Sequence, residues 1–277
     1  MKALVSGIFI LIRVLLAYAD LEVTVVSGTS KGRPILLGSV TLERTQVRRG
    51  GNAPPYDVKG KRNSTGASGN WCGGLQHTPS TNKFTGISAY FAAPNLLSRP
   101  NTPYPQHAAS WIGIDGASCQ TALLQAGTTT SLDQNGTQTS NAWLEWIPDA
   151  AYTIPSFPLS PGDWMFVNIS VLSSTSAQLV LENYSLGNTV TFNLINGTPL
   201  CQADTEWIVE DFSTNVGQVP FARFSDIWFE QCQARTTNGS VISIEGATII
   251  ALQNTGITPS CIAQEYDDQN FWCSSQG

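Results

Sequence analysis

The chain has 277 residues, of which 42% are hydrophobic and only 12% are charged. A surface helix needs Lys, Glu and Arg on its solvent face, so this composition, with 24 Gly and 15 Pro, argues against a helical fold. The net charge of −6 and the pI near 4.8 disfavour a nucleic-acid partner. Beyond the first twenty positions there is no apolar run of about 20 residues, so we predict no internal membrane span.

Positive and negative charges are separated along the chain. Residues 1–62 hold 10 of the 14 Lys and Arg and 4 of the 20 Asp and Glu, a balance of +6. Residues 63–277 hold the other 4 basic and 16 acidic residues, a balance of −12. Below about pH 4 most of those carboxylates become protonated, and their mutual repulsion falls. The larger part of the chain is therefore suited to an acidic medium.

The amino-terminal part has the layout of processed segments. Residues 1–19 contain a lysine, an apolar stretch and a final Ala-Tyr-Ala, which predicts a secretory signal peptide. Residues 20–62 carry 8 Lys and Arg against 4 Asp and Glu and end in a dibasic pair, Lys61-Arg62. We interpret them as a basic propeptide removed near Arg62, followed by one domain over residues 63–277. The alternative is a solvated basic tail that stays attached.

Cysteines and sequons both favour secretion. All six cysteines follow Arg62, and an even number in a secreted chain favours disulfides. No Cys or His spacing is that of a zinc site, and we predict neither a metal nor another cofactor. Asn-x-Ser/Thr sequons indicate a glycoprotein, and they occur at Asn63, Asn135, Asn168, Asn183, Asn196 and Asn238.

The pattern after residue 70 is that of an all-β protein. Residues 164–172, 177–181 and 190–195 are short, roughly alternating runs rich in β-branched and aromatic residues. Gly, Asn, Ser or Pro separate them at the spacing typical of a sandwich or barrel, and no helical stripe of useful length occurs. A sandwich of two antiparallel sheets fits this pattern best.

Strand alternation places polar and aromatic residues on shared faces. Successive residues of a strand point to opposite sides, so every second residue shares a face. The sets expected to share a face are Trp111, Gly113 and Asp115; Trp143 and Glu145; Glu206, Ile208, Glu210 and Phe212. Gln125 is expected to end a strand over residues 121–125. Carboxylates in apolar strands are costly unless paired, hydrogen-bonded or used, so we expect a binding groove on a sheet face.

Several kinds of catalysis lack the residues they need. The only histidines, His77 and His107, lie in Pro-rich sequence expected to form solvent-exposed loops, and no Gly-x-Ser-x-Gly motif occurs. His-Glu-x-x-His and the Asp-Thr/Ser-Gly motif of pepsin-like proteases are absent too. What remains is no chemistry, or carboxylate chemistry by Asp115, Glu145, Glu206, Glu210 and Asp211.

Five sequence blocks closely resemble the glutamic peptidases, or eqolisins. They are NWCGG (70–74), ASWIGIDG (109–116), CQTALLQAG (119–127), AWLEWIP (142–148) and TEWIVEDF (205–212). The resemblance implies a secreted, acid-active endopeptidase made with a propeptide and working without metal. It also implies a sandwich of two curved antiparallel sheets, like the jelly roll of concanavalin and other lectins.

The resemblance also implies roles for single residues. Gln125 and Glu210 correspond to the catalytic dyad, in which Glu moves the protons and Gln stabilises the oxyanion. Positions matching the substrate groove are Trp71, Trp111, Asp115, Trp143, Glu145 and Phe212; the aromatics would clamp an extended peptide and the acids would orient the dyad. A disulfide between Cys119 and Cys201 is implied as well. The expected partners are polypeptide substrates and the chain's own propeptide, with no membrane, and the protein is expected to be a monomer.

Three positions depart from the family pattern. Thr129, Ile147 and Ser213 stand where family members carry Asp, Tyr and Glu, which bears on pH optimum and specificity. Two other functions stay open on the residues alone. One is a glycosidase using two of Glu145, Glu206 and Glu210, and the other is a non-catalytic sandwich that binds carbohydrate or peptide.

Overall fold

The computed structural model describes residues 20–45, 65–78, 81–253 and 258–277. The predicted signal peptide, the sequon Asn63 and the predicted cleavage site at Arg62 lie outside these residues. Within them the chain forms strands and one short 3-10 helix, η1 (Leu37–Ser39), with no α-helix. No described segment forms a helix with the length and apolarity to cross a membrane. The predicted all-β fold is confirmed.

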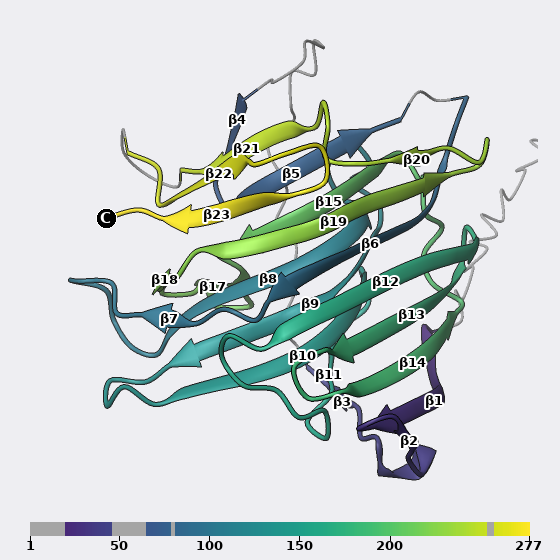
Figure 1. The fold of residues 1–277 in the computed structure, drawn as a ribbon, viewed down its shortest axis with the longest axis horizontal. Coiled ribbons are helices and arrows are strands. Elements are labelled where there is room, and N and C mark those ends of the chain that lie inside the picture. Colours follow the sequence, from purple (N-terminus) through teal and green to yellow (C-terminus); the bar gives the residue numbers. More distant parts are fainter. Residues whose placement is uncertain (1–19, 46–64, 79–80, 254–257) are drawn as a thin grey trace, which may run out of the picture.

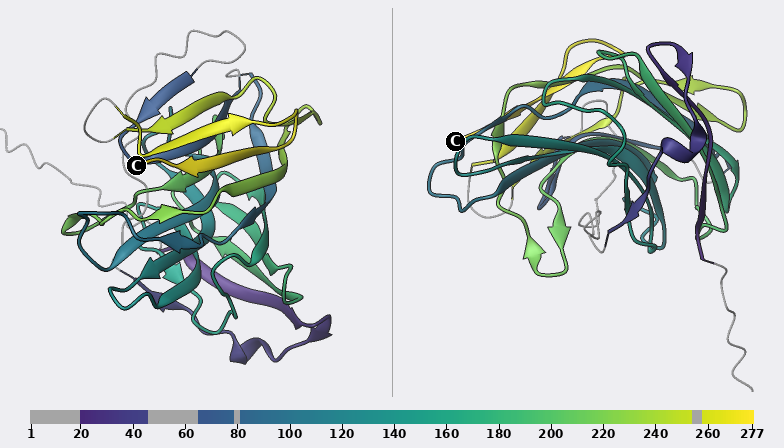
Figure 2. Two further views of the ribbon diagram at one scale, coloured as in Figure 1. Left: turned by 60° about the vertical axis from the view of Figure 1, so that its left-hand side comes forward. Right: turned by 90° about the horizontal axis from the view of Figure 1, so that it is seen from below.

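The strands form two curved layers that nest against each other (Figures 1 and 2). We call one the inner sheet; its strands are antiparallel neighbours, except that β4 runs parallel to β21. In spatial order the inner sheet contains β3 (Glu43–Arg44), β11 (Tyr152–Thr153), β10 (Gln138–Ile147), β9 (Leu123–Leu132), β8 (Gln106–Asp115), β15 (Asp204–Glu210), β5 (Trp71–His77), β21 (Thr248–Leu252) and β4 (Thr65–Ser68).

The second layer, the outer sheet, is antiparallel throughout its described strands. In spatial order it contains β2 (Arg33–Pro34), β1 (Glu22–Ser30), β14 (Asn188–Ile195), β13 (Ser176–Asn183), β12 (Trp164–Ser173), β6 (Phe84–Ala92), β19 (Ile227–Thr236), β23 (Phe271–Ser275) and β22 (Cys261–Glu265), with β20 (Val241–Ile242) beside β19. Smaller pairs join β7 (Leu96–Leu97) to β18 (Arg223–Phe224) and β16 (Ser213–Thr214) to β17 (Gly217–Gln218). Because β22 also pairs with β21, the two layers are joined along one side.

The main core lies between the two sheets. Ile112 and Leu124 face it from the inner sheet, and Val167, Leu179 and Phe192 face it from the outer sheet, all buried. Alternate residues of the inner sheet contribute instead to a second cluster, on the face turned away from this core. The period of two predicted for the strands thus gives the inner sheet two different buried faces.

One strand prediction was wrong in extent. Gln125 does not end a strand; it is the third residue of β9, which continues to Leu132. Gly127 suggests a turn, but here it allows a close approach, since a Cβ at this position would lie 2.2 Å from the Ser110 carbonyl oxygen and 2.5 Å from the Trp111 Cβ. The residues that follow are strand-favouring threonines. The ladder to β8 and β10 therefore runs past the glycine.

The cysteines are only partly paired. The disulfide between Cys119 and Cys201 is present, with Cα atoms 6.1 Å apart, and a second joins Cys72 to Cys261. Cys232 and Cys273 are buried free thiols, contrary to the expectation from an even count. Burial raises the pKa of both thiols, and because the thiolate is the reactive form, they are poor nucleophiles in the folded protein.

The amino-terminal residues belong to the same folded unit. β1 adds an edge strand to β14, and β3 adds one to β11. Residues 20–45, which fall in the predicted propeptide, thus reach from the edge of one sheet to the edge of the other (Figure 2).

Candidate active site

The register of four strands aligns polar residues across the inner sheet. Glu206 on β15 lies opposite Gly113 on β8, which lies opposite Gln125 on β9, which lies opposite Glu145 on β10. Residues opposite one another in an antiparallel pair point to the same side. The three polar side chains of this row therefore share one face, with only a glycine between Glu206 and Gln125.

Glu210 lies on the same face. It is four residues beyond Glu206 along β15, an even separation that preserves the side in a strand. Its opposite neighbours are Trp71 on β5 and Ala109 on β8. Both belong to the second cluster, so the face carrying Gln125 and Glu210 is the one turned away from the main core.

Three side-chain N–H groups hold the Glu210 carboxylate. The Trp111 indole nitrogen donates to Oε2 at 2.8 Å and the Trp71 indole nitrogen donates to Oε1 at 3.1 Å. The Asn70 amide donates to Oε1 at 3.2 Å. All three donors are uncharged over the whole pH range of interest, so these three bonds do not depend on the titration of the donors. Glu210 is fully buried.

The Gln125 amide is fixed by Glu145. Its Nε2 donates to Glu145 Oε2 at 2.7 Å, and both side chains are fully buried. An ionised carboxylate can only accept hydrogen bonds, so this contact determines that the amide presents its NH2 group to Glu145. Glu145 thereby sets the orientation of the Gln125 side chain.

The predicted groove aromatics gather in the second cluster. It contains Trp71, Trp111, Trp143 and Phe212, together with Leu75, Ala109, Ala117, Leu123, Ile208 and Ile250. The Trp71 and Trp111 rings meet edge to face, 5.2 Å between centroids. Trp146 and Trp207, by contrast, pack in the main core. Trp143 and Trp111 each lie opposite Gly127 on β9, so the two indole side chains share one sheet face with the glycine between them.

Asp115 bonds the backbone near β15 rather than the side chains of Gln125 or Glu210. Its carboxylate accepts the backbone N–H groups of Gln202, at 2.9 Å, and Ala203, at 2.8 Å. Burial raises the pKa of Asp115 to about 6, although these two bonds oppose the shift. Asp115 therefore anchors the residues that lead into β15, next to the Cys119–Cys201 disulfide.

Asp204 anchors the same region from the other side. It accepts hydrogen bonds from His77, from both the backbone and hydroxyl of Ser118, and from the Cys119 backbone. Burial opposes its ionisation, but the bonds from His77 and Ser118 outweigh that effect and lower its pKa. His77 and His107 are half-buried and lie on β5 and β8, so the prediction of exposed loops was wrong.

Glu206 is a carboxyl group without a hydrogen-bond partner. It is fully buried, and neither of its oxygens has a partner among the described residues. Burial, with Asp204 and Asp115 nearby, raises its pKa well above the ordinary value. Glu206 is therefore held in its neutral form over a wider pH range than an ordinary glutamate.

The three departures from the family pattern fall in different places. Thr129 lies opposite Ala109, which lies opposite Glu210. A carboxylate at position 129 would therefore point to the same sheet face as Glu210. Ile147 ends β10 and packs against the second cluster, and Ser213 begins β16, in the hairpin that follows Phe212. A hydroxyl at 129 removes one potential negative charge from the site.

Sequence reasoning missed the part played by Asn70. The residue was included in the NWCGG block, but nothing in its spacing marked it as a donor to a carboxylate 140 residues away. Its own environment is set locally, because the Ser68 hydroxyl donates to its amide oxygen at 3.1 Å. That bond leaves the Asn70 amide nitrogen pointing at Glu210.

With this geometry in place, family comparison identifies the class. Residues 69–274 match the sequence model described as the Peptidase A4 family. The match spans most of the chain, and the chain therefore belongs to the Peptidase A4 family, the eqolisins. It is accordingly a hydrolase of the endopeptidase type.

Two individual proteins are similar to this chain in sequence. Aspergillopepsin-2 of Aspergillus niger is 32% identical over 204 residues, which cover 68% of this chain and 72% of the relative. Scytalidopepsin B of Scytalidium lignicola is 33% identical over 165 residues, covering 56% of this chain and 62% of the relative.

Solved structures share the fold. A crystal structure of scytalido-glutamic peptidase with a transition state analog inhibitor has a TM-score of 0.64 and 29% identity, covering 75% of this chain and 98% of that one. The crystal structure of aspergilloglutamic peptidase from Aspergillus niger has a TM-score of 0.57 and 30% identity, covering 62% and 99%. The β-sandwich predicted from the sequence is that of these neighbours.

Proposed function

We propose that this glutamic endopeptidase is secreted and cleaves peptide bonds in acid with Gln125 and Glu210 as its catalytic dyad. The observation that carries the proposal is the pair of indole N–H groups that hold the Glu210 carboxylate on the same sheet face as Gln125. Hydrogen bonds from neutral donors fix the position of the carboxylate without supplying or removing a proton, which supports a role in proton transfer.

Glu210 is assigned the proton transfers. In its ionised form it takes a proton from the attacking water, and it then returns that proton to the leaving amine. General acid and base catalysis needs a side chain that can take up and give back a proton in the working pH range, and a carboxyl group is the side chain type that does so in acid. Trp71 and Trp111 keep the carboxylate in position through both steps.

Gln125 is assigned the oxyanion. An amide nitrogen carries two hydrogens, so Gln125 can bond Glu145 with one and the substrate carbonyl oxygen with the other. An amide does not titrate, and it therefore remains a donor at the acidic pH where Glu210 works. Stabilisation of a tetrahedral oxyanion by one such donor is worth about 3–4 kcal/mol.

The aromatic cluster is assigned to the substrate. Trp111 and Trp143 lie on either side of Gly127, on the sheet face that carries Gln125 and Glu210. Such a surface suits an extended peptide with apolar side chains. In the uncut chain Gln125, Glu210 and the two rings are all buried. A substrate can therefore bind only to a form of the protein in which these side chains are accessible.

Activity is therefore expected to follow processing. We expect the uncut chain to be inactive near neutral pH and to be cut near Arg62 on acidification, because the dyad is buried in the full-length chain. A time course of acidified protein, followed by intact mass and by activity, tests this. Full activity of the uncut chain at neutral pH would contradict it.

The class of reaction has a direct assay. Purified protein incubated with a denatured protein substrate across pH 2–7 should cleave it only in the acidic part of the range. Because no aspartic-protease dyad is proposed, pepstatin should leave the rate unchanged. Parallel incubation with polysaccharides, read as released reducing sugar, should give no product. Sugar release without proteolysis would show a glycosidase, and binding without turnover at any pH would show a non-catalytic sandwich.

Secretion and glycosylation complete the proposal. The sequon residues Asn135, Asn196 and Asn238 are exposed and can carry glycans. Asn183 cannot do so in the folded chain, since it is buried and donates to the Pro158 carbonyl and the Asp163 carboxylate. We expect a monomeric extracellular enzyme whose substrates are polypeptides.

A further inference from the structure

We propose that residues 20–45 remain bound to the sandwich after the chain is cut near Arg62, as a noncovalent edge strand of the mature enzyme. We call these residues the amino-terminal strap and residues 65–277 the body. The proposal rests on the processing described under the proposed function. It differs from the usual expectation that a propeptide leaves once it is cut.

The first reason is the ladder that β1 forms. Eight residues of β1 pair with β14, from Glu22 opposite Ile195 to Ser30 opposite Asn188, with one irregularity between Val25 and Ser27. This ladder covers the whole length of β14. Without the strap, β14 would be an edge strand with a row of unpaired N–H and C=O groups.

The second reason is apolar burial. Leu21 is 5% exposed and belongs to the main core, and Val23 and Val25 pack against that core from the strap. Val40 and Leu42, farther along, also pack against it. These side chains complete the main core at its open side, so loss of the strap would expose the core to water.

The strap is also held at its other end. β3 pairs with β11 through Glu43 and Arg44, and the Thr45 backbone N–H donates to the Ala151 carbonyl at 2.7 Å. The Thr41 N–H donates to the Ser156 hydroxyl at 2.9 Å. The strap thus closes the side of the sandwich opposite the one where β21, β22 and β23 join the sheets (Figure 2).

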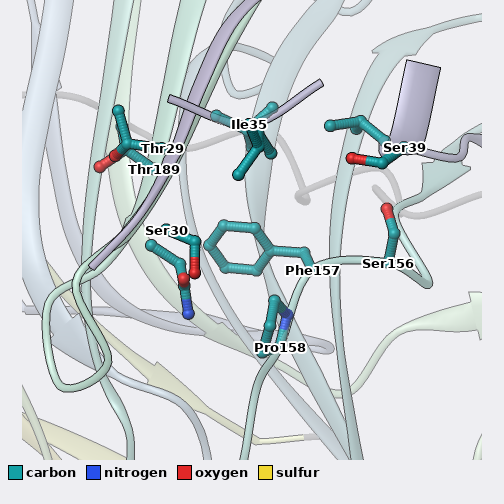
Figure 3. Close-up of a pocket in the computed structure, with 11 residues that line it drawn as sticks. Thr29, Ser30, Ile35, Ser39, Ser156, Phe157, Pro158 and Thr189 are labelled. Atoms are coloured by element: carbon teal, nitrogen blue, oxygen red, sulfur yellow. The ribbon is translucent and has the colours of Figure 1, made fainter. Parts of the chain in front are cut away.

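Strap and body share the walls of a cavity of about 180 Å³ (Figure 3). Ile35 and Val40 line it from the strap, and Phe157, Pro158 and Val190 line it from the body. Figure 3 shows the Phe157 ring and Ile35 facing this space from the two sides. If the strap left, the apolar side chains of the body that line this cavity would face water. Their exposure is a further cost of losing the strap.

Charge does not hold the strap, so acid does not release it. Its charged residues are Lys31, Arg33 and Arg44 against Asp20, Glu22 and Glu43, a net charge of zero. The whole excess of +4 in residues 20–62 therefore lies in residues 46–62, which carry 5 basic residues and 1 acidic one.

The body offers few charges to the strap. Among the described residues, Arg44 and Asp149 form the one ion pair between strap and body, 4.0 Å apart and with 55% and 21% of their side chains exposed. Glu22 accepts a hydrogen bond from Asn196, and Glu182 lies in the row beyond Thr189, which pairs with Thr29. Asp149 also accepts a hydrogen bond from the Leu21 backbone and lies near Asp20, and burial raises its pKa. Protonating these carboxylates removes a long, partly exposed pair and leaves the ladder and the apolar contacts intact.

The test separates cutting from retention. In the Glu210→Gln variant, which should not process itself, residues 57–62 are replaced by the recognition sequence of a site-specific protease, and the chain is cut. A denaturing gel reports the cut; native mass spectrometry and size exclusion at pH 7 and pH 4 report retention. We expect the fragment to stay with the body at both pH values and to separate only in guanidinium. A fragment that leaves a folded body at pH 4 would overturn the proposal.

A matched pair of variants tests the contact. Leu21→Gln combined with Val23→Gln should weaken retention of the cut fragment about a hundredfold, at roughly a tenfold loss for each side chain that packs on the core. Val26→Gln, at the irregularity where the side chain is 37% exposed, should leave retention unchanged. Equal behaviour of the two variants would also overturn the proposal. Because the cut is engineered, absence of natural processing or of peptidase activity would affect only the proposed function.

Discussion

Replacing Glu210 with glutamine is expected to lower the rate of peptide hydrolysis in acid at least about 1,000-fold, since the general base and acid is lost. The fold should remain, because glutamine has the same shape and still accepts a hydrogen bond. One indole N–H, from Trp71 or Trp111, would then face an amide N–H, so a small loss of thermal stability is also expected. Rates on a denatured substrate at pH 3–4, with circular dichroism of the same sample, measure both effects.

Two further variants make this result specific. Gln125→Ala should lower the rate by about 100- to 1,000-fold, the range for loss of one oxyanion donor. Glu182→Gln, which alters a half-buried glutamate on the outer sheet, should leave the rate unchanged. A Glu210→Gln enzyme that retains full activity would reject the assignment of the dyad. Equal losses in Glu210→Gln and Glu182→Gln would point to damage of the fold instead.

Stability is expected to decline from acid toward neutral pH because of Glu206. In the folded protein the pKa of this carboxyl group lies well above the ordinary value of 4.5, mainly through burial. The folded chain therefore holds the proton more tightly than the unfolded chain does. The resulting stabilisation is complete below about pH 4.5 and is lost as pH rises through the folded pKa.

Asp115 acts in the same direction. Its pKa rises from 3.8 to about 6 on folding, chiefly through burial, so its stabilisation is complete below pH 3.8 and declines toward pH 6. A shift of this size corresponds to about 3 kcal/mol. Asp115 is unsuitable for substitution, because its carboxylate holds the backbone at Gln202 and Ala203.

Glu206→Gln is the direct test of this pH dependence. Made in the Glu210→Gln background, where self-digestion cannot intervene, it should melt like its parent at pH 4 and higher than its parent at pH 7. We expect a gain of about 2–4 °C for each kcal/mol of ionisation cost removed. Glu182→Gln in the same background serves as the control and should follow the parent at every pH. Parallel melting curves for Glu206→Gln and its parent from pH 4 to pH 7 would contradict the account.

The local pattern of the site could be predicted from the sequence. Alternation correctly placed Glu206, Ile208 and Glu210 on one side of a strand and separated Trp111 from the isoleucines beside it. Period-two patterning carries this information because each strand residue has only two possible directions. The sequence blocks likewise led to the sandwich and to the Cys119–Cys201 disulfide.

What could not be predicted depends on register between distant strands. That Gln125 lies opposite Glu145, or that Asn70 donates to Glu210, follows from pairings across 20 and 140 residues. The pairing of β1 with β14 was not predicted, because the basic residues of the region 20–62 suggested a segment that is removed. The strand itself carries valines among polar residues, a pattern that fits a half-buried strand. Asp115 was expected to orient the dyad; its contacts to Gln202 and Ala203 could not be predicted, because they depend on a loop far along the chain.

The position of β15 has a consequence for synthesis of the protein. This strand lies between β5 and β8 although both come much earlier in the chain, and it carries Glu210. Until β15 has left the ribosome, the edges of β5 and β8 that it pairs with stay open, and Glu210 is not yet in the sheet. Such non-local insertion is slow, and waiting strand edges are prone to aggregation. If Gln125 and Glu210 are the dyad proposed above, a nascent chain has no complete dyad with which to cleave other proteins until β15 has emerged.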